Sequence, residues 1–399
     1  MLKGDASWST KKRILGWDLD TRASTLTLPP HRLDRLYELL ELISPPKRRV
    51  PVKRWHLLLG ELRSMSPTLP GARGLFSILQ DSLGKADRNR ARITNEVWHM
   101  AANFRAIADS LRARPTRLRE LVPSHPSHVG ACDACILGMG GVWFPEGDHT
   151  PTLPILWRQP FSSKVQKALI TAQNPHGSFS ISDLELAALI AHKDIIASHH
   201  PVAERTIWMA TDNRAELSWS DAGSATSTAC SRAYLLRFNS LHQRVHRYVA
   251  SHNHIPGKAS VMADNASRLW HLTDAELLAH FATFYPQASP WQLSTLAPDT
   301  NLALTDALLF KQQPAREFLG NVSALPAPLG RSGPPFVRAS PSTPSTSRAT
   351  PSPFSKRSLN ACAAAHCPPA VDPCDLAQWK TPSEQWARRM PGWGPRTLA

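Results

Sequence analysis

Five short apolar segments alternate with helical segments between residues 123 and 272, and this order constrains the fold more than any other feature. The apolar segments are typical of strands: VGACDACIL (129–137), GVWF (141–144), PILWRQPF (154–161), RTIWMAT (205–211) and HRYVASH (246–252). The helical segments are 182–197, 213–221, 225–243 and 261–269. Strands and helices mixed in one stretch predict a compact α/β domain over 123–272.

The first 122 residues have a different character, mainly helical and basic. Residues 13–28 are typical of a β-hairpin, and helices are predicted over 29–43, 54–65 and much of 72–113. The first 120 residues contain 23 Lys and Arg against 12 Asp and Glu, a large share of the chain's net charge of +15. A basic module beside a nearly neutral one favours binding of a polyanion, although solubility alone could account for the charge.

The rest of the chain offers less. Residues 273–330 are expected to form a helical extension or linker, and 331–399 a disordered tail rich in Pro and Ser. Tail residues with irregular zinc-ligand spacing are Cys362, His366, Cys367 and Cys374. No apolar run approaches the ~18 residues of a membrane span, and six cysteines fit a reducing compartment. Nothing indicates a localisation beyond the cell interior.

One carboxylate interrupts the first strand candidate. Asp133 lies in VGACDACIL among apolar and small residues, and a carboxylate inside a sheet needs a partner. The following GMGGVW predicts a tight turn into the second strand, so Asp133 is a candidate cation ligand. The flanking Cys132 and Cys135 form C-x-x-C, but in a strand they point to opposite faces and would not share a metal.

Three further acids each have an ordinary alternative. Glu185 has capping-box spacing from Ser182, so it could cap its helix. Asp212 ends a strand, where ligands bind in open sheets, but it or Asn213 could cap the next helix. Asp264 lies in a helix's first turn, where the dipole favours negative charge. Together with Asp133 they predict a carboxylate cage for two Mg²⁺ ions, which roughly 4 Å apart can cleave a phosphodiester.

At these residues the chain resembles a ribonuclease H domain. The motifs are CDACILGMGG, SDLELAAL, ATDNRAELSW and HIPGKASVMADNASR, in the family's order of Asp, Glu, Asp, His and Asp. The resemblance implies a ribonuclease H-like mixed sheet flanked by helices. It also implies catalytic Asp133, Glu185, Asp212 and Asp264 as ligands of two Mg²⁺ ions, with Mn²⁺ as the alternative metal. His254 would lie on a mobile loop near the scissile phosphate and help proton movement or product release.

The form H-x-P-G followed by A-D-x-x-S-R resembles retrotransposon ribonuclease H domains. Upstream, ILGWDLD, the helix after LPPHR and WHLLLGELRSMSPTLPGARGLF resemble the thumb and connection of a retroelement reverse transcriptase. The combination most resembles the tyrosine-recombinase (DIRS-like) class. It implies cleavage of the RNA strand of RNA–DNA hybrids, nucleic acid as the partner, and the polymerase part of the same element as another.

Two departures from this family limit the expectations. Ser260 stands where the family has Asn, four residues before the last Asp; Ser can still cap the final helix and donate a hydrogen bond. The chain also has no adjacent Asp-Asp pair, which the polymerase palm requires. We therefore expect no polymerisation, and interpret the chain as the C-terminal part of a longer polyprotein or as a degenerate genomic copy.

Two rival functions stay open at this level. A decayed retroelement fragment would bind hybrids without cutting them, and a transposase or integrase of the DDE type would use the same fold. The helix-borne Glu185 and the H-x-P-G block favour ribonuclease H. Four tryptophans in this region are expected in the core rather than as stacking platforms: Trp143, Trp157, Trp208 and Trp219.

Overall fold

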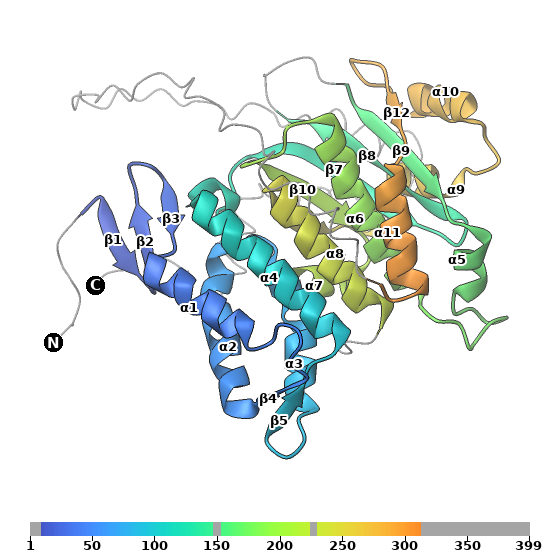
Figure 1. Ribbon diagram of the computed structural model, residues 1–399. Helices are drawn as coiled ribbons and strands as arrows, with labels where there is room; N and C mark the ends of the chain where they lie inside the picture. Colours follow the sequence, from blue (N-terminus) through green and yellow to red (C-terminus); the bar gives the residue numbers. More distant parts are fainter. Residues whose placement is uncertain (1–8, 147–152, 224–229, 313–399) are drawn as a thin grey trace, which may run out of the picture.

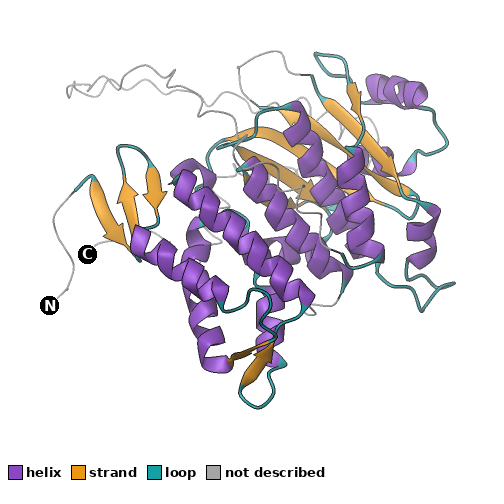
Figure 2. Ribbon diagram, viewed as in Figure 1, coloured by secondary structure: helices purple, strands orange, loops and turns teal. Residues whose placement is uncertain are grey.

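The computed structural model describes residues 9–146, 153–223 and 230–312 (Figures 1 and 2). A mainly helical region comes first and a large mixed β-sheet covered by helices follows. The helices of the first region are α1 (Pro30–Glu41), α2 (Val52–Met65), α3 (Ser77–Gly84) and α4 (Asn95–Ala113). Their apolar faces share one core, which includes Trp55, Leu59 and Phe104. The predicted tail and its cysteine–histidine group lie outside the described residues.

The strands of the first region differ from the single hairpin expected over 13–28. They form a four-stranded antiparallel sheet in the order β1 (Lys11–Ile14), β2 (Trp17–Asp20), β3 (Thr25–Thr27) and β6 (Thr116–Arg117). The first turn falls at Leu15 and Gly16, which have φ values of 50° and 78°. A separate ribbon of β4 (Arg49–Pro51) and β5 (Arg90–Arg92) interrupts the predicted helical stretch 72–113.

Six strands form the main sheet in the order β11-β10-β7-β8-β9-β12. They are β7 (Pro126–Ala134), β8 (Gly138–Pro145), β9 (Ile155–Pro160), β10 (Thr206–Thr211), β11 (Val249–His254) and β12 (Gln292–Ser294). The central β8 is antiparallel to both its neighbours, whereas β10 is parallel to β7 and to β11. The carboxyl ends of the three mutually parallel strands β7, β10 and β11 therefore lie side by side at the same end of the sheet.

Helices cover both faces of this sheet (Figure 1). They are α5 (Ser163–Ala168), α6 (Ile181–His199), α7 (Arg214–Ala222), α8 (Ser231–His246), α9 (Val261–Arg268), α10 (Asp274–Phe284) and α11 (Pro298–Leu309). On one face α6, α8 and α11 pack with Trp143 and Trp157, while on the other α9 and α10 pack with Val142 and Leu156. Neighbouring residues of β8 and of β9 thus face opposite cores, as the strand period of two requires.

Glycines in β8 bring α9 close to the sheet. We expected GMGG to form the turn after the first strand, but the turn falls at Cys135–Leu137 and Gly138 begins β8. A Cβ atom on Gly140 would lie 2.6 Å from the backbone of Ala266 in α9, and one on Gly138 would lie 2.2 Å from the Trp270 ring. The glycines therefore make room for α9, which carries Asp264, and for the Trp270 ring that follows it.

Residues 273–312 are more closely integrated than a linker. The short strand β12 pairs in parallel with β9 and becomes an edge of the main sheet. The helix α11 adds Leu304 and Leu308 to the core under α6 and α8, and the Ser231 hydroxyl donates a hydrogen bond to the Leu308 carbonyl at 2.8 Å. This segment thus completes the sheet region.

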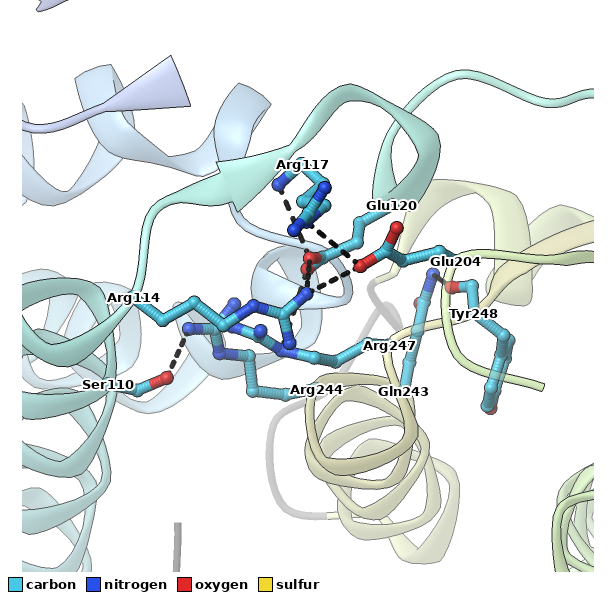
Figure 3. A network of polar contacts seen from close by, with 9 residues as sticks. All are labelled: Ser110, Arg114, Arg117, Glu120, Glu204, Gln243, Arg244, Arg247 and Tyr248. Carbon is cyan, nitrogen blue, oxygen red and sulfur yellow. Dashed lines mark hydrogen bonds and ion pairs between the residues drawn. The ribbon is translucent and has the colours of Figure 1, made fainter. Parts of the chain in front are cut away.

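A network of ion pairs joins the helical region to the sheet region (Figure 3). The Arg114 guanidinium donates to carboxylate oxygens of Glu120 and Glu204, each at 2.8 Å. On the sheet side, Arg247 at the end of α8 lies 3.6 Å from Glu120, and Arg244 donates to the Ser110 hydroxyl at 2.8 Å. Because Glu120 and Arg247 are almost fully buried, this junction depends on their pairing.

The architecture confirms the predicted fold class, a mixed β-sheet flanked by helices and preceded by a mainly helical region. Within the described ranges, no helix combines the length and apolar character needed to span a membrane.

Candidate metal centre

Asp133 lies near the end of β7, in register with Gly140 of β8, and only 7% of it is exposed. The Ser267 hydroxyl of α9 donates a hydrogen bond of 2.6 Å to its Oδ2 atom. Burial raises the pKa of Asp133, and the nearby Asp264 and Asp212 add to this, while Ser267 acts in the opposite direction. A buried carboxylate with anionic neighbours is suited to hold a cation.

Glu185 is not a helix cap, contrary to the alternative that its sequence left open. Helix α6 begins two residues earlier than that alternative requires, and its capping box joins Ser180 and Asp183: the Ser180 backbone N–H donates to the Asp183 carboxylate at 2.8 Å. Glu185 instead accepts a hydrogen bond from the Asn213 amide. Burial, followed by repulsion from Asp133 and Asp212, raises the pKa of Glu185 to about 8.

Asp212 follows β10 directly, and its capping alternative belongs to its neighbour. The Asn213 side-chain oxygen accepts from the backbone N–H groups of Ala215 and Glu216, so Asn213 is the cap of α7. The Asp212 carboxylate is left exposed at the sheet edge. One carboxylate oxygen from each of Asp133, Glu185 and Asp212 lies within 4.8 Å of the others, a group that could hold a metal ion.

Asp264 lies beside this group but is not part of it. Its carboxylate pairs with Arg268, four residues later in α9, at 2.8 Å. The same guanidinium lies 3.8 Å from Asp133. Burial raises the pKa of Asp264, with Asp212 adding to the effect and Arg268 opposing it. The predicted fourth ligand is thus held by a protein cation.

His254 ends strand β11 in register with Thr211, and does not lie on the loop that the resemblance implied. Its Nε2 atom is 3.1 Å from the backbone carbonyl oxygen of Asp212. In the following turn, a Cβ atom on Gly257 would lie 2.9 Å from the Asp212 carboxylate. The glycine of H-x-P-G therefore leaves room for Asp212.

Ser260 does not fill the role expected of it. It precedes α9, yet its side chain makes no capping hydrogen bond. Its hydroxyl is buried and has no hydrogen-bond partner among the described residues.

Two residues close to the carboxylates, Glu216 and Ser267, have no predicted function. Glu216 in α7 is fully buried, and the Thr211 hydroxyl donates to it at 2.9 Å. Burial raises the pKa of Glu216 well above its usual value. Ser267 had a signal in the A-D-x-x-S-R motif, whereas Glu216 looked like an ordinary acid in a helix's first turn.

The two cysteines and four tryptophans singled out in this region lie in or against the protein core, form a hydrogen bond within the protein or are half-buried on a strand. Cys132 is buried in the core, while the Cys135 thiol, after β7, donates to the Ser267 carbonyl; both are free. Trp143 and Trp157 are buried in the core. Trp219 is partly buried against that core, and Trp208 is half-buried on β10.

Comparisons with known proteins find only remote structural similarity. No protein-family model and no curated protein sequence matches the chain. A structure of the foamy viral protease-reverse transcriptase in complex with an RNA/DNA hybrid is similar at 12% identity and a TM-score of 0.26, over 61% of this chain and 29% of that one. Another, in complex with double-stranded DNA, is similar at 14% identity and a TM-score of 0.25, over 62% of this chain and 45% of that one. This chain therefore spans less than half the length of either protein.

Proposed function

We propose that this protein is a metal-dependent nuclease that cleaves the RNA strand of RNA–DNA hybrids. The observation that carries the proposal is the convergence of Asp133, Glu185 and Asp212, whose carboxylate oxygens lie within 4.8 Å of one another. Their elements are far apart in the sequence, and burial leaves the pKa values of Asp133 and Glu185 raised. Such a repulsive group is stabilised by a cation with a preference for oxygen ligands.

The donor set fits Mg²⁺, with Mn²⁺ as the alternative. Asp133, Glu185 and Asp212 would hold the ions, and Asp264 would join them once Arg268 releases it. Two such ions lower the pKa of an attacking water and stabilise the leaving oxygen. Ser267 fixes the orientation of Asp133, and Asn213 that of Glu185, through the hydrogen bonds described above.

His254 is proposed to assist proton movement at the edge of this centre. Its Nε2 atom donates to the Asp212 carbonyl in the tautomer that satisfies this contact, which leaves Nδ1 free to exchange a proton with the leaving group. The end of a strand holds the ring more firmly than a loop would. We therefore assign His254 a proton-transfer role rather than a gating role.

The basic helical region is proposed to hold the nucleic-acid duplex. On the ribbon of β4 and β5, Arg49 lies directly opposite Arg92, next to Arg90, and all three are exposed. Like charges opposite each other in a ribbon destabilise it unless an anion bridges them. Phosphates of a duplex would supply that anion, and binding would weaken with salt.

The sequence resemblance motivates the wider assignment. We propose a reverse-transcriptase thumb and connection over 1–122 and a ribonuclease H domain over 123–272, in a retrotransposon protein of the DIRS-like class. The separate polymerase part of the same element would then be a partner. Residues 273–330 would be an extension of the ribonuclease H domain, and 331–399 a tail.

Cleavage of a hybrid with different labels on its two strands tests the proposal. The full chain is compared with Asp133→Asn and with the matched control Asp306→Asn on α11, with and without Mg²⁺. We expect cutting of the RNA strand alone, dependent on Mg²⁺, lost by at least a hundredfold in Asp133→Asn and retained in Asp306→Asn. Cutting of both strands, or equal activity in the two variants, would contradict the proposal.

A second function, hybrid binding without cleavage, is favoured by two observations. Asp264 is paired with Arg268, and the Ser260 hydroxyl is turned into the protein interior. Both would weaken the hold on metal and substrate. Binding of the hybrid at unchanged affinity by wild type and Asp133→Asn, with no cleavage by either, would establish this alternative.

A further inference from the structure

A second group of metal-ligating side chains lies between two helices on one face of the sheet. It consists of Asp194 on α6 and of His242 and His246 on α8, and one ligand atom from each lies within 4.8 Å of the other two. The two histidines are four residues apart, so they lie on the same face of α8, one turn from each other. Their rings are 4.3 Å apart between centroids.

This group is separate from the carboxylate centre. Asp194 follows Glu185 by nine residues in the same helix, which places it about 13 Å further along the axis at 1.5 Å per residue. None of the three residues takes part in the nuclease proposed above. They lie where α6 packs against α8. At the same contact the Lys193 ammonium, next to Asp194 in the sequence, donates to the Asn239 amide oxygen of α8 at 2.7 Å.

The donor atoms are arranged as in a metal site. The Nε2 atom of His242 is 3.2 Å from the Oδ1 atom of Asp194, and its Nδ1 atom is 3.0 Å from the Tyr248 hydroxyl. When the Tyr248 hydroxyl accepts a hydrogen bond from Nδ1–H of His242, Nε2 is the free ligand atom, as in metal-binding histidines that have a hydrogen-bonded partner behind them. The contact is therefore compatible with the tautomer of His242 that a metal needs.

Two further features indicate that this group could bind a metal ion. Asp194 is 6% exposed, and its Oδ2 atom is buried with no hydrogen-bond partner among the described residues. A buried carboxylate oxygen without a partner is costly. The His246 ring lies beside the His242 ring and adds a second imidazole donor to the group. His246 is only partly buried, which gives an ion a way in.

We propose that Asp194, His242 and His246 form a Zn²⁺ site that joins α6 to α8. Two imidazoles and one carboxylate are donors that Zn²⁺ prefers, whereas Mg²⁺ prefers oxygen ligands alone. The fourth coordination position of the ion lies on the solvent side of the group, next to His246, and is filled by water. The ion stabilises the packing of α8 against the helix that carries Glu185.

A chain of hydrogen bonds from Asp194 through His242 to Tyr248 is the simpler interpretation of the same contacts. It accounts for Oδ1 of Asp194 and for both nitrogens of His242. It does not satisfy the Oδ2 atom of Asp194, and it gives no role to the His246 ring beside it. A tetrahedral cation would use both.

Zinc binding by the full chain tests the proposal. The chelator-treated protein is loaded with ZnCl₂, passed through a desalting column and assayed for zinc content, and its melting temperature is recorded with and without zinc. The variants are His246→Gln, at the solvent edge, and Asp194→Asn, which keeps the shape of the side chain. His199→Gln, on α6 outside the group, is the matched control, and the differences between variants remove any zinc held elsewhere in the chain.

We expect wild type and His199→Gln to retain one zinc ion per chain more than His246→Gln and Asp194→Asn. Zinc at a hundredfold excess over its Kd should raise the melting temperature of wild type by about 5 °C or more, and that of the two variants by less. Excess Mg²⁺ should not displace the ion. Equal zinc content in all four proteins, or wild type without a zinc-dependent shift, would show that the group is only a hydrogen-bonded network.

Discussion

Replacing Glu185 by Gln should make the metal-free protein more stable, although the residue lies at the proposed active centre. The pKa of Glu185 is raised from 4.5 to about 8 by burial and by Asp133 and Asp212. Between these two pH values the unfolded chain binds fewer protons than the folded chain at this group. Stability therefore falls as the pH rises from 4.5 towards 8 and stays constant above it. Gln cannot ionise, so Glu185→Gln escapes this loss.

The size of the effect follows from the shift in pKa. One pKa unit corresponds to about 1.36 kcal/mol. Ionisation of Glu185 in the unfolded chain therefore lowers the free energy of unfolding by roughly 3 kcal/mol at pH 7 and by about 1 kcal/mol at pH 5. Gln has nearly the same shape, and its amide oxygen can accept the hydrogen bond of the Asn213 amide, so the substitution opens no cavity and keeps Asn213 paired. The gain corresponds to an increase in melting temperature of roughly 5 °C or more at pH 7.

Thermal denaturation in EDTA at pH 5, 7 and 8 measures this gain, and a second series in excess Mg²⁺ measures its reversal. In Mg²⁺ the wild type should be stabilised and Glu185→Gln much less, because the variant lacks one anionic ligand. Glu146→Gln, after strand β8, is the matched control. A variant less stable than wild type in EDTA at pH 8, or a difference that does not change with pH, would refute the idea of a mutually repelling carboxylate group.

Three further predictions concern the surroundings of the site. Arg268→Gln removes a cation that competes with metal, so the Mg²⁺ concentration for half-maximal cleavage should fall about threefold to tenfold in a metal titration; an unchanged value would contradict the competition. Gly140→Ala forces a Cβ atom against the Ala266 backbone and should lower stability by about 1–3 kcal/mol in urea denaturation, with loss of cleavage. Exchanging Arg49 and Arg92 for Gln should reduce the slope of log affinity for a hybrid against log salt by about one for each phosphate that the protein no longer neutralises, measured by fluorescence anisotropy.

The main strands could be predicted from the sequence because each has an apolar segment of its own. RTIWMAT was expected over 205–211, and β10 runs from Thr206 to Thr211. The prediction failed where the pattern depends on a distant partner. The glycines of GMGG were interpreted as a turn, but α9, more than 120 residues later, packs on them. The strand β12 escaped notice because three residues, QLS, carry no periodicity, and its pairing with β9 defines it.

The candidate site shows the same division between local and distant information. Asp133 could be singled out from the sequence because packing offers no reason for a carboxylate inside a strand. For Glu185 and Asp212 the local alternatives were caps, and only the positions of Ser180 and Asn213 in the folded chain exclude them. The pairing of Asp264 with Arg268 was equally hidden, since an i, i+4 ion pair on a helix looks the same beside a metal site as on a bare surface.

The carboxylate group and the zinc-ligand group present the same physical problem at two ends of α6. In each, charged or polar atoms have been removed from water without full compensation from the protein: repelling carboxylates around Glu185, and an unpaired carboxylate oxygen on Asp194. Folding around such groups lowers stability by an amount that a cation can restore on binding. Because the two donor sets differ, one all oxygen and the other mostly nitrogen, different metals should restore the two losses. Stabilisation by Mg²⁺ and by Zn²⁺ should then be additive in wild type and separately abolished by Glu185→Gln and His246→Gln.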